Sequence, residues 1–300
     1  MAEQTSGQTS GQTPTPDAGR LHVALVQAAS TLDPAENAAT LRRLVARAAT
    51  EARQLSAGSE PEVEVLVVLP EVFQRDFGRP DTDLSAVAEP LDGPFVTALT
   101  EAAAEHRVTV LAGMFRHDGS DAADPRPFNT RPFNTLVLRR PDGSGVEYDK
   151  VHLYDSFGYK ESDRLRAGAW TPVTVDVGGM RLGLMTCYDL RFPELARALV
   201  EAGAEALVLP AAWVAGDRKV DHWRTLVRAR AIENTCYVAA VGQPAPRYSG
   251  HSTVVAPTGD VLVEAGAGSA TEVEVLHTVL EATEVASVRN VNPSLANRRG

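Results

Sequence analysis

RLGLMTCYDLRFPE, residues 181–194, joins a short apolar segment to the start of a helix through a cysteine. The apolar segment Leu182–Met185 predicts a buried strand, and Pro193 is typical of a first helical turn. Apolar residues then continue at helical spacing at positions 192, 195, 196, 199 and 200. The segment therefore predicts a strand, a tight turn at Cys187 and a helix.

Cys187 is a candidate nucleophile because of its place on this turn. A thiol there would lie at the rim of a sheet, close to backbone N–H groups at the beginning of the helix. Such groups lower a thiol pKa and stabilise an oxyanion. A free cysteine is more often a small buried hydrophobic residue, so the turn alone leaves both interpretations open.

Strand and helix patterns alternate on both sides of this segment. The β-branched run Val63–Leu69 predicts a central strand covered on both faces, and Asp33 followed by Pro34 predicts a helix N-terminus. Further helices are expected over residues 95–106 and around Trp223. The other expected strands are 21–27, 108–113, 135–138, 145–148, 173–177, 206–210, 236–241, 252–255 and 261–263. The mixture predicts one layered α/β domain with mixed sheets over residues 21–300.

Three segments fall outside this alternation. Residues 1–20 are rich in Gln, Thr, Ser, Gly and Pro, a composition that predicts a disordered N-terminal tail. The pentapeptide RPFNT occurs twice within residues 126–135, which we interpret as a local insertion in a loop. The last residues, 292–300, are expected to form a C-terminal arm.

Composition excludes several classes of function. A net charge of −10 and a pI of about 5.2 argue against nucleic acid or an anionic membrane surface as a partner. No run reaches the roughly 18 apolar residues that a membrane span needs. The two cysteines, Cys187 and Cys236, argue against a disulfide framework and favour a reducing, cytoplasmic compartment, with Cys236 as a core residue.

Three charged residues stand at or near strand ends. Glu71 follows the run Val63–Leu69, Lys150 ends a predicted strand, and Glu161 comes shortly after it. Taken singly, each is interpreted as a solvated structural residue. The histidines near strand or helix ends also lack a distinctive context, and are expected at the rim of a site or behind it; they are His152, His222 and His251.

Together with Cys187, these charged residues form a recognisable pattern. Leu69–Glu71, Tyr148–Leu153 and Cys187–Glu194 resemble the three signatures of the nitrilase superfamily of carbon–nitrogen hydrolases. The resemblance extends from about residue 21 to about residue 280. It includes flanking motifs at 134–135, 161–162, 167–168, 221–223, 228–234 and 250–252.

The resemblance implies a four-layer αββα sandwich with mixed β-sheets and a Glu-Lys-Cys triad. Glu71 would be the general base, Lys150 the cationic stabiliser and Cys187 the nucleophile. Glu161 matches a second glutamate that holds the lysine and orients the substrate. The backbone N–H of Tyr188 would help to stabilise the oxyanion that precedes a thioester. This chemistry needs no metal and no other cofactor.

The residues after the cysteine indicate a branch of the superfamily. Nitrilases usually carry Trp-Glu there, whereas Tyr188–Glu194 resembles the amidase branch, including omega-amidases and deaminated glutathione amidases. The expected reaction is hydrolysis of a small linear, carboxylate-bearing amide to carboxylate and ammonia. Arg191 and Trp213 are candidate substrate-binding residues, along with Arg218 and Arg247, although a surface or packing role is equally open for each.

Other functions remain open from the sequence. The insert at residues 154–159 departs from familiar amidases in a pocket-forming loop, so an N-carbamoyl amino-acid hydrolase or a nitrilase is the alternative within the fold. A non-catalytic binding scaffold is the alternative from another class, but it would not need Glu71, Lys150, Glu161 and Cys187 together. The resemblance also implies a homodimer or larger homo-oligomer, with Phe192 or Leu195 near a partner subunit.

Overall fold

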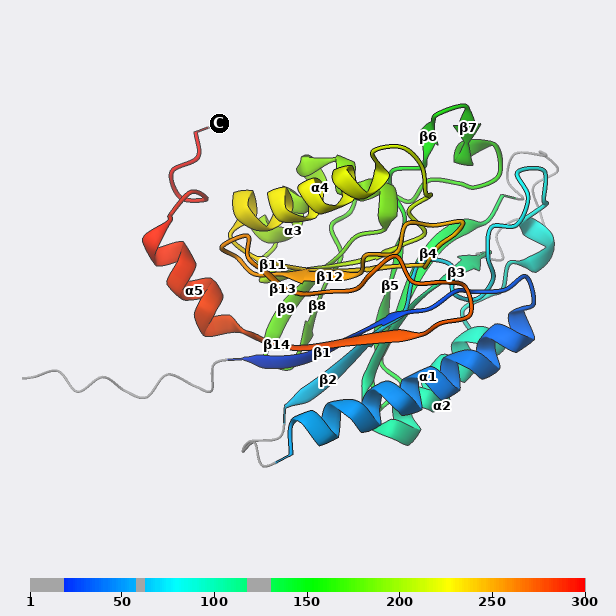
Figure 1. Cartoon of the computed structure of the whole chain (residues 1–300), viewed down its shortest axis with the longest axis horizontal. Coiled ribbons are helices and arrows are strands. Elements are labelled where there is room, and N and C mark those ends of the chain that lie inside the picture. Colours follow the sequence, from blue (N-terminus) through cyan, green and yellow to red (C-terminus); the bar gives the residue numbers. More distant parts are fainter. Residues whose placement is uncertain (1–18, 58–62, 118–130, 300) are drawn as a thin grey trace, which may run out of the picture.

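The computed structural model describes residues 19–57, 63–117 and 131–299. Two six-stranded mixed sheets pack face to face between pairs of helices, giving the four-layer αββα sandwich (Figure 1). One pair covers the outer face of the first sheet: α1 (Pro34–Leu55) and α2 (Pro94–His106). The other pair covers the second sheet: α3 (Pro193–Glu201) and α4 (Lys219–Asn234).

The first sheet has the order β14-β1-β2-β3-β4-β5. Its strands are β1 (Arg20–Gln27), β2 (Glu64–Val68), β3 (Thr109–Arg116), β4 (Phe133–Arg139), β5 (Gly145–Asp149) and β14 (Glu274–Glu281). The strands β1, β2 and β3 are parallel, and the flanking strands pair antiparallel. β4 runs antiparallel to β3, and β5 runs antiparallel to β4. β5 therefore has the same direction as β2 and ends at the same edge of the sheet.

The second sheet has the order β13-β12-β11-β10-β9-β8 and the same plan. Its strands are β8 (Thr174–Val177), β9 (Met180–Leu184), β10 (Ala206–Ala211), β11 (Tyr237–Gly242), β12 (Thr253–Val255) and β13 (Val261–Glu264). The strands β9, β10 and β11 are parallel, with antiparallel neighbours outside them. In such sheets, ligands bind beyond the carboxyl ends of the parallel strands.

The strand β2 shows why the sheets pack on both faces. Leu66 and Val68 belong to the core between the two sheets, whereas Val65 and Val67 belong to the cluster beneath α1 and α2. Successive side chains of a strand point to opposite faces, so an unbroken apolar run must be covered twice. The predicted central strand is confirmed.

The beginning of α1 also follows the sequence. The Asp33 carboxylate accepts hydrogen bonds from the backbone N–H groups of Ala35 and Glu36, at 2.9 and 3.4 Å, and Pro34 occupies the first turn. These groups have no partner inside the helix, so the cap satisfies them.

The C-terminal part holds two elements that the sequence analysis did not predict. The strand β14 pairs with β1 along its whole length, and β1 itself begins at Arg20, one residue earlier than expected. The helix α5 (Ala282–Val291) follows, with Val285 as its buried side chain. No helix in the described parts of the chain combines the length and apolarity that crossing a membrane requires.

The remaining expectations concern the contact with a partner subunit, the N-terminal tail and the repeated RPFNT. Leu195 is fully buried in the core of its own chain, and Phe192 directly precedes α3; the expected partner subunit stays a prediction. The expected tail up to residue 18 and the first RPFNT copy lie outside the described residues. Part of the second copy forms the beginning of β4, at Phe133.

Candidate active site

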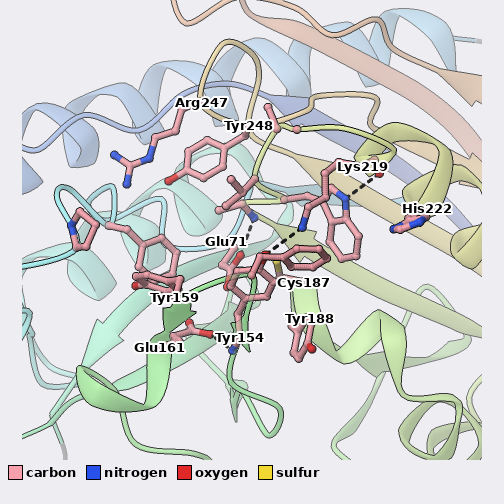
Figure 2. Close-up of a pocket in the computed structure, with 18 of the residues that line it drawn as sticks. Glu71, Tyr154, Tyr159, Glu161, Cys187, Tyr188, Lys219, His222, Arg247 and Tyr248 are labelled. Atoms are coloured by element: carbon pink, nitrogen blue, oxygen red, sulfur yellow. Dashed lines mark hydrogen bonds between the residues drawn. The ribbon is translucent and has the colours of Figure 1, made fainter.

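A cavity of about 660 Å³ lies at the carboxyl ends of strands from both sheets (Figure 2). Residues from four strand ends line it: Glu71 after β2, Lys150 after β5, Cys187 after β9, and Trp213 after β10. The parallel-strand edges of the sheets therefore bring together all four residues, although they are far apart in the sequence.

Cys187 occupies the predicted tight turn. It opens a short 3-10 helix, η4 (Cys187–Arg191), and α3 begins only at Pro193. Its backbone φ of 47° lies in the left-handed region, which is costly for a residue other than glycine and occurs often at functional sites. The residue is only 7% exposed, and it lines the cavity.

Asp189 fixes this turn from inside the protein. Its carboxylate, fully buried, accepts hydrogen bonds from the backbone N–H of Thr186 at 2.9 Å and the hydroxyl of Tyr148 at 2.7 Å. It also accepts the backbone N–H of His152 at 3.0 Å. Asp189 thus joins the turn of Cys187 to the segment that carries Lys150. Asp189 belongs to the motif Cys187–Glu194, but the sequence pattern did not predict this role.

Lys150 is buried between two carboxylates. Its Nζ lies 2.9 Å from Glu71 Oε1, and 3.1 and 2.9 Å from the two Glu161 oxygens. Burial alone would lower the pKa of Lys150, but the negative charges of Glu161 and Glu71 outweigh burial and raise it well above its ordinary value. Lys150 therefore keeps its proton throughout the neutral range.

Glu71 is held by contacts to three elements. Its Oε2 accepts the backbone N–H of Ala212 at 2.6 Å, and its Oε1 accepts Asn134 Nδ2 at 2.7 Å. The chain at Glu71 and Val72 passes so close to β3 that a Cβ at position 113 would lie 2.3 Å from Val72 N. Gly113 is thus required for Glu71 to reach the cavity.

Glu161 opens the 3-10 helix η3 (Glu161–Asp163) on the other side of Lys150. Its Oε2 accepts the backbone N–H of Tyr154 at 2.6 Å, and Asn134 Nδ2 lies 3.4 Å from its Oε1. Burial raises the pKa of Glu161. The positive charge of Lys150 opposes this shift, and the negative charge of Glu71 adds to it.

The thiol of Cys187 differs from the sequence-based expectation. Burial raises its pKa well above the ordinary value, and the negative charge of Glu71 and a hydrogen bond to that side chain add to the effect, with Lys150 opposing it. The prediction that the turn lowers the thiol pKa is therefore wrong. Desolvation and a carboxylate outweigh the nearby N–H groups, and the thiol is neutral at neutral pH.

The predicted substrate-binding residues divide into two groups. Tyr188 and Trp213 line the cavity, but Arg191 is not among the lining residues. Its guanidinium instead packs 4.8 Å from the centre of the Trp213 ring. Arg218 and Arg247 do line the cavity, where each already pairs with an aspartate.

Lys219 was missed by the sequence analysis. It is the first residue of α4, it lines the cavity, and its Nζ lies 3.0 Å from the hydroxyl of Tyr154. A compositional signal was present, because only 3 of the 29 basic residues of the chain are lysines. Two of those three, Lys150 and Lys219, line this one cavity.

The insert at residues 154–159 also lies where the sequence suggested. It forms a hairpin of β6 (Asp155–Ser156) and β7 (Tyr159–Lys160) beside the cavity. Both turn residues, Phe157 and Gly158, have positive φ angles of 55° and 79°, as in a two-residue hairpin turn. Three aromatic residues of the segment line the cavity: Tyr154, Phe157 and Tyr159.

Within the described ranges, no three His, Cys, Asp or Glu side chains are grouped in a way that could hold a metal ion.

Comparisons with known proteins show the family to which the chain is similar. The profile of the carbon–nitrogen hydrolase family matches residues 22–290. A hydrolase of Mycobacterium tuberculosis is 35% identical over 295 residues, covering 93% of this chain and 95% of its own. A deaminated glutathione amidase of Escherichia coli is 37% identical over 246 residues, covering 82% and 88%. The solved structure of a CN-hydrolase superfamily protein of Xanthomonas campestris has a TM-score of 0.76 at 29% identity, covering 94% of this chain and 98% of its own.

Proposed function

The chain belongs to the carbon–nitrogen hydrolase family, and we propose that it hydrolyses a small linear, carboxylate-bearing amide to a carboxylate and ammonia. The observation that carries the proposal is the buried ion cluster beside Cys187, in which Lys150 lies between Glu71 and Glu161. The Escherichia coli relative is named an amidase, which supports the reaction type.

Glu71 is the general base in this proposal. The neutral thiol of Cys187 must lose its proton as it attacks, and Glu71, which lines the same cavity, is the carboxylate that acts most strongly on that thiol. Lys150 is unsuited to the task because it holds its own proton so firmly. The proton passes from Cys187 Sγ to Glu71 while Sγ bonds to the amide carbon.

The tetrahedral intermediate carries a negative oxygen that needs stabilisation. The ammonium of Lys150 and the backbone N–H of Tyr188 are the proposed donors. Tyr188 lies in the first turn of η4, where backbone N–H groups have no partner within the helix. One such donor typically contributes about 3–4 kcal/mol to lowering the barrier.

The second half of the reaction regenerates the enzyme. Glu71 returns the proton to the departing nitrogen, ammonia leaves, and a thioester on Cys187 remains. A water molecule then attacks the thioester carbon, giving one proton to Glu71, and the carbon–sulfur bond breaks. The thiolate takes that proton back from Glu71, and the carboxylic acid product ionises and leaves.

Ammonia release from a panel of small amides, N-carbamoyl amino acids and nitriles tests this proposal. We expect turnover of the linear amides, with the amide of a dicarboxylic acid among them. Turnover of carbamoyl compounds with release of carbon dioxide, or of nitriles alone, would retain the nucleophile and contradict the amide assignment. No turnover of any member would favour a non-catalytic scaffold.

A further inference from the structure

Lys219 carries a charge that no carboxylate in the described parts of the chain neutralises. Its Nζ donates to the Tyr154 hydroxyl at 3.0 Å, which leaves two of its three N–H donors open. The residue as a whole is buried to more than nine-tenths, yet its ammonium lies on the cavity wall. Figure 2 shows Lys219, Tyr154 and Cys187 around the same space.

The other lysine and arginine side chains of the cavity already have a carboxylate partner or several hydrogen bonds. Arg247 pairs with Asp76 at 2.7 Å, and Arg218 with Asp221 at 2.9 Å. Arg164 donates its three groups to two backbone carbonyls and to the Tyr159 hydroxyl. Lys150 is held by its two glutamates. Among these cations, Lys219 combines the absence of a carboxylate partner in the described residues with a single hydrogen bond, so it is the one most available to an entering anion.

Aromatic rings hold the ammonium in place. It lies 4.2 Å from the ring centre of Phe157, 5.0 Å from that of Tyr154 and 5.8 Å from that of Trp213. The carbonyl of Lys219 also accepts the indole N–H of Trp213 at 3.0 Å. A compact ammonium suits such a cage, whereas a planar guanidinium is larger and fixes its donors in a fork.

Tyr154 connects this ammonium to the reacting centre. Its backbone N–H binds Glu161, which in turn holds Lys150, and its hydroxyl binds Lys219 at the far end of the same side chain. Glu161 and Lys219 thus contact the two ends of the same residue. Cys187 and Lys219 line one cavity, so a single small linear molecule can contact both.

We propose that Lys219 binds the free carboxylate of the substrate, so that the enzyme selects short anionic amides over neutral ones of the same length. This inference rests on the proposed amidase function. The β6–β7 hairpin contributes to the same specificity because Tyr154 and Phe157 hold the ammonium against the cavity.

Two amides of equal length test the proposal: succinamate, which carries a carboxylate, and butyramide, which carries a methyl group instead. The measured quantity is the ratio of their kcat/KM values. We expect Lys219→Met to reduce the preference for succinamate about ten- to hundredfold, mainly through KM, as is usual for the loss of one charged hydrogen bond. Lys219→Arg should retain more of the preference than Lys219→Met.

The matched control is Lys160→Met, which makes the same change on β7 at an exposed residue outside the cavity lining. It should show the wild-type preference. A wild-type enzyme that hydrolyses butyramide as well as succinamate, or a Lys219→Met variant with the wild-type preference, would overturn the assignment of Lys219 and leave the amidase function standing.

A binding measurement separates the two proposals if no amide is hydrolysed. In a Cys187→Ala background, calorimetry with succinamate should show affinity that falls at least about tenfold on adding Lys219→Met. Equal affinity with and without Lys219, or no detectable binding, would overturn the inference.

Discussion

His152 is bound to Asp189 twice, through its backbone N–H at 3.0 Å and through its imidazole Nδ1 at 2.8 Å. The opposite oxygen of Asp189 accepts the backbone N–H of Thr186, directly before the nucleophile. A single buried carboxylate therefore sets the position of Cys187 relative to Lys150, which lies two residues before His152. Phe192 stacks on the same imidazole, with ring centres 3.7 Å apart, and closes this contact on its outer side.

Replacing Asp189 with asparagine tests this relationship. Asp189→Asn puts an amide NH2 where the carboxylate accepts hydrogen bonds from buried donors. We expect a loss of about 2–3 kcal/mol in the free energy of unfolding, measured with urea, and a lower kcat. Asp176→Asn, at an exposed pair with Arg181, is the control and should change stability by less than about 0.5 kcal/mol. Wild-type stability and kcat in Asp189→Asn would contradict the positioning role.

Glu161→Gln removes one of the two charges that hold Lys150. The Glu161 charge raises the Lys150 pKa, so the variant lowers that pKa and loosens the ammonium. Because the ammonium is proposed to stabilise the transition state, kcat should fall roughly a hundredfold with little change in KM. Glu147→Gln, on β5 at a partly exposed pair with Arg139, should retain activity. A variant in which only KM changes would contradict this role.

The raised pKa of Cys187 predicts how kcat/KM depends on pH. Its thiol is protonated throughout the neutral range, and the proton moves to Glu71 within the site rather than to solvent. We therefore expect kcat/KM for a neutral amide to stay flat between about pH 7 and 9. If the small thiolate fraction were the reacting form instead, kcat/KM would rise about tenfold per pH unit over that range. The substrate is a neutral amide because Lys219 is proposed to bind only the carboxylate of an anionic one.

His22 predicts how stability depends on pH. Burial, reinforced by the charge of His277, lowers the pKa of His22 from 6.5 to about 4. The unfolded chain therefore binds a proton at His22 before the folded chain does, so stability is lost as the pH falls from about 6.5 to 4. The groups that face this histidine are Ser56 and His277, and Glu51 lies beyond His277. The decrease in Tm over this range should be smaller in His22→Gln; an equal decrease would contradict the assignment.

Much of the fold follows from local patterns. The run Val63–Leu69 is apolar on both faces, so any sheet that contains it must be covered twice, as β2 is. The Asp33 cap and the turn at Cys187 depend on a few neighbouring residues, and both formed as predicted. By contrast, β14 depends on its pairing with β1, which is some 250 residues away in the sequence, and half-buried side chains give it no clear pattern.

The site residues that belong to a motif could be predicted from the sequence. The features that depend on long-range contacts could not. The resemblance named Glu71, Lys150, Glu161 and Cys187, and the fold brings them to one cavity. The thiol pKa was misjudged because burial of the thiol, and after it the charge of a carboxylate from the other sheet, depend on long-range packing. Arg191 was named as a candidate and Lys219 was not, because a motif shows which residues occur but not which way each side chain points at the end of a turn.

The central claim is that Cys187 is the nucleophile, and the chain offers a matched control in its other cysteine. Cys236 is fully buried, and burial raises its pKa to about 12. Ammonia release from the best amide of the panel should be compared in the wild type, Cys187→Ala and Cys236→Ala. The account predicts that Cys187→Ala loses at least about a thousandfold in kcat while Cys236→Ala keeps most of it. Ammonia release by Cys187→Ala at the wild-type rate would contradict the account.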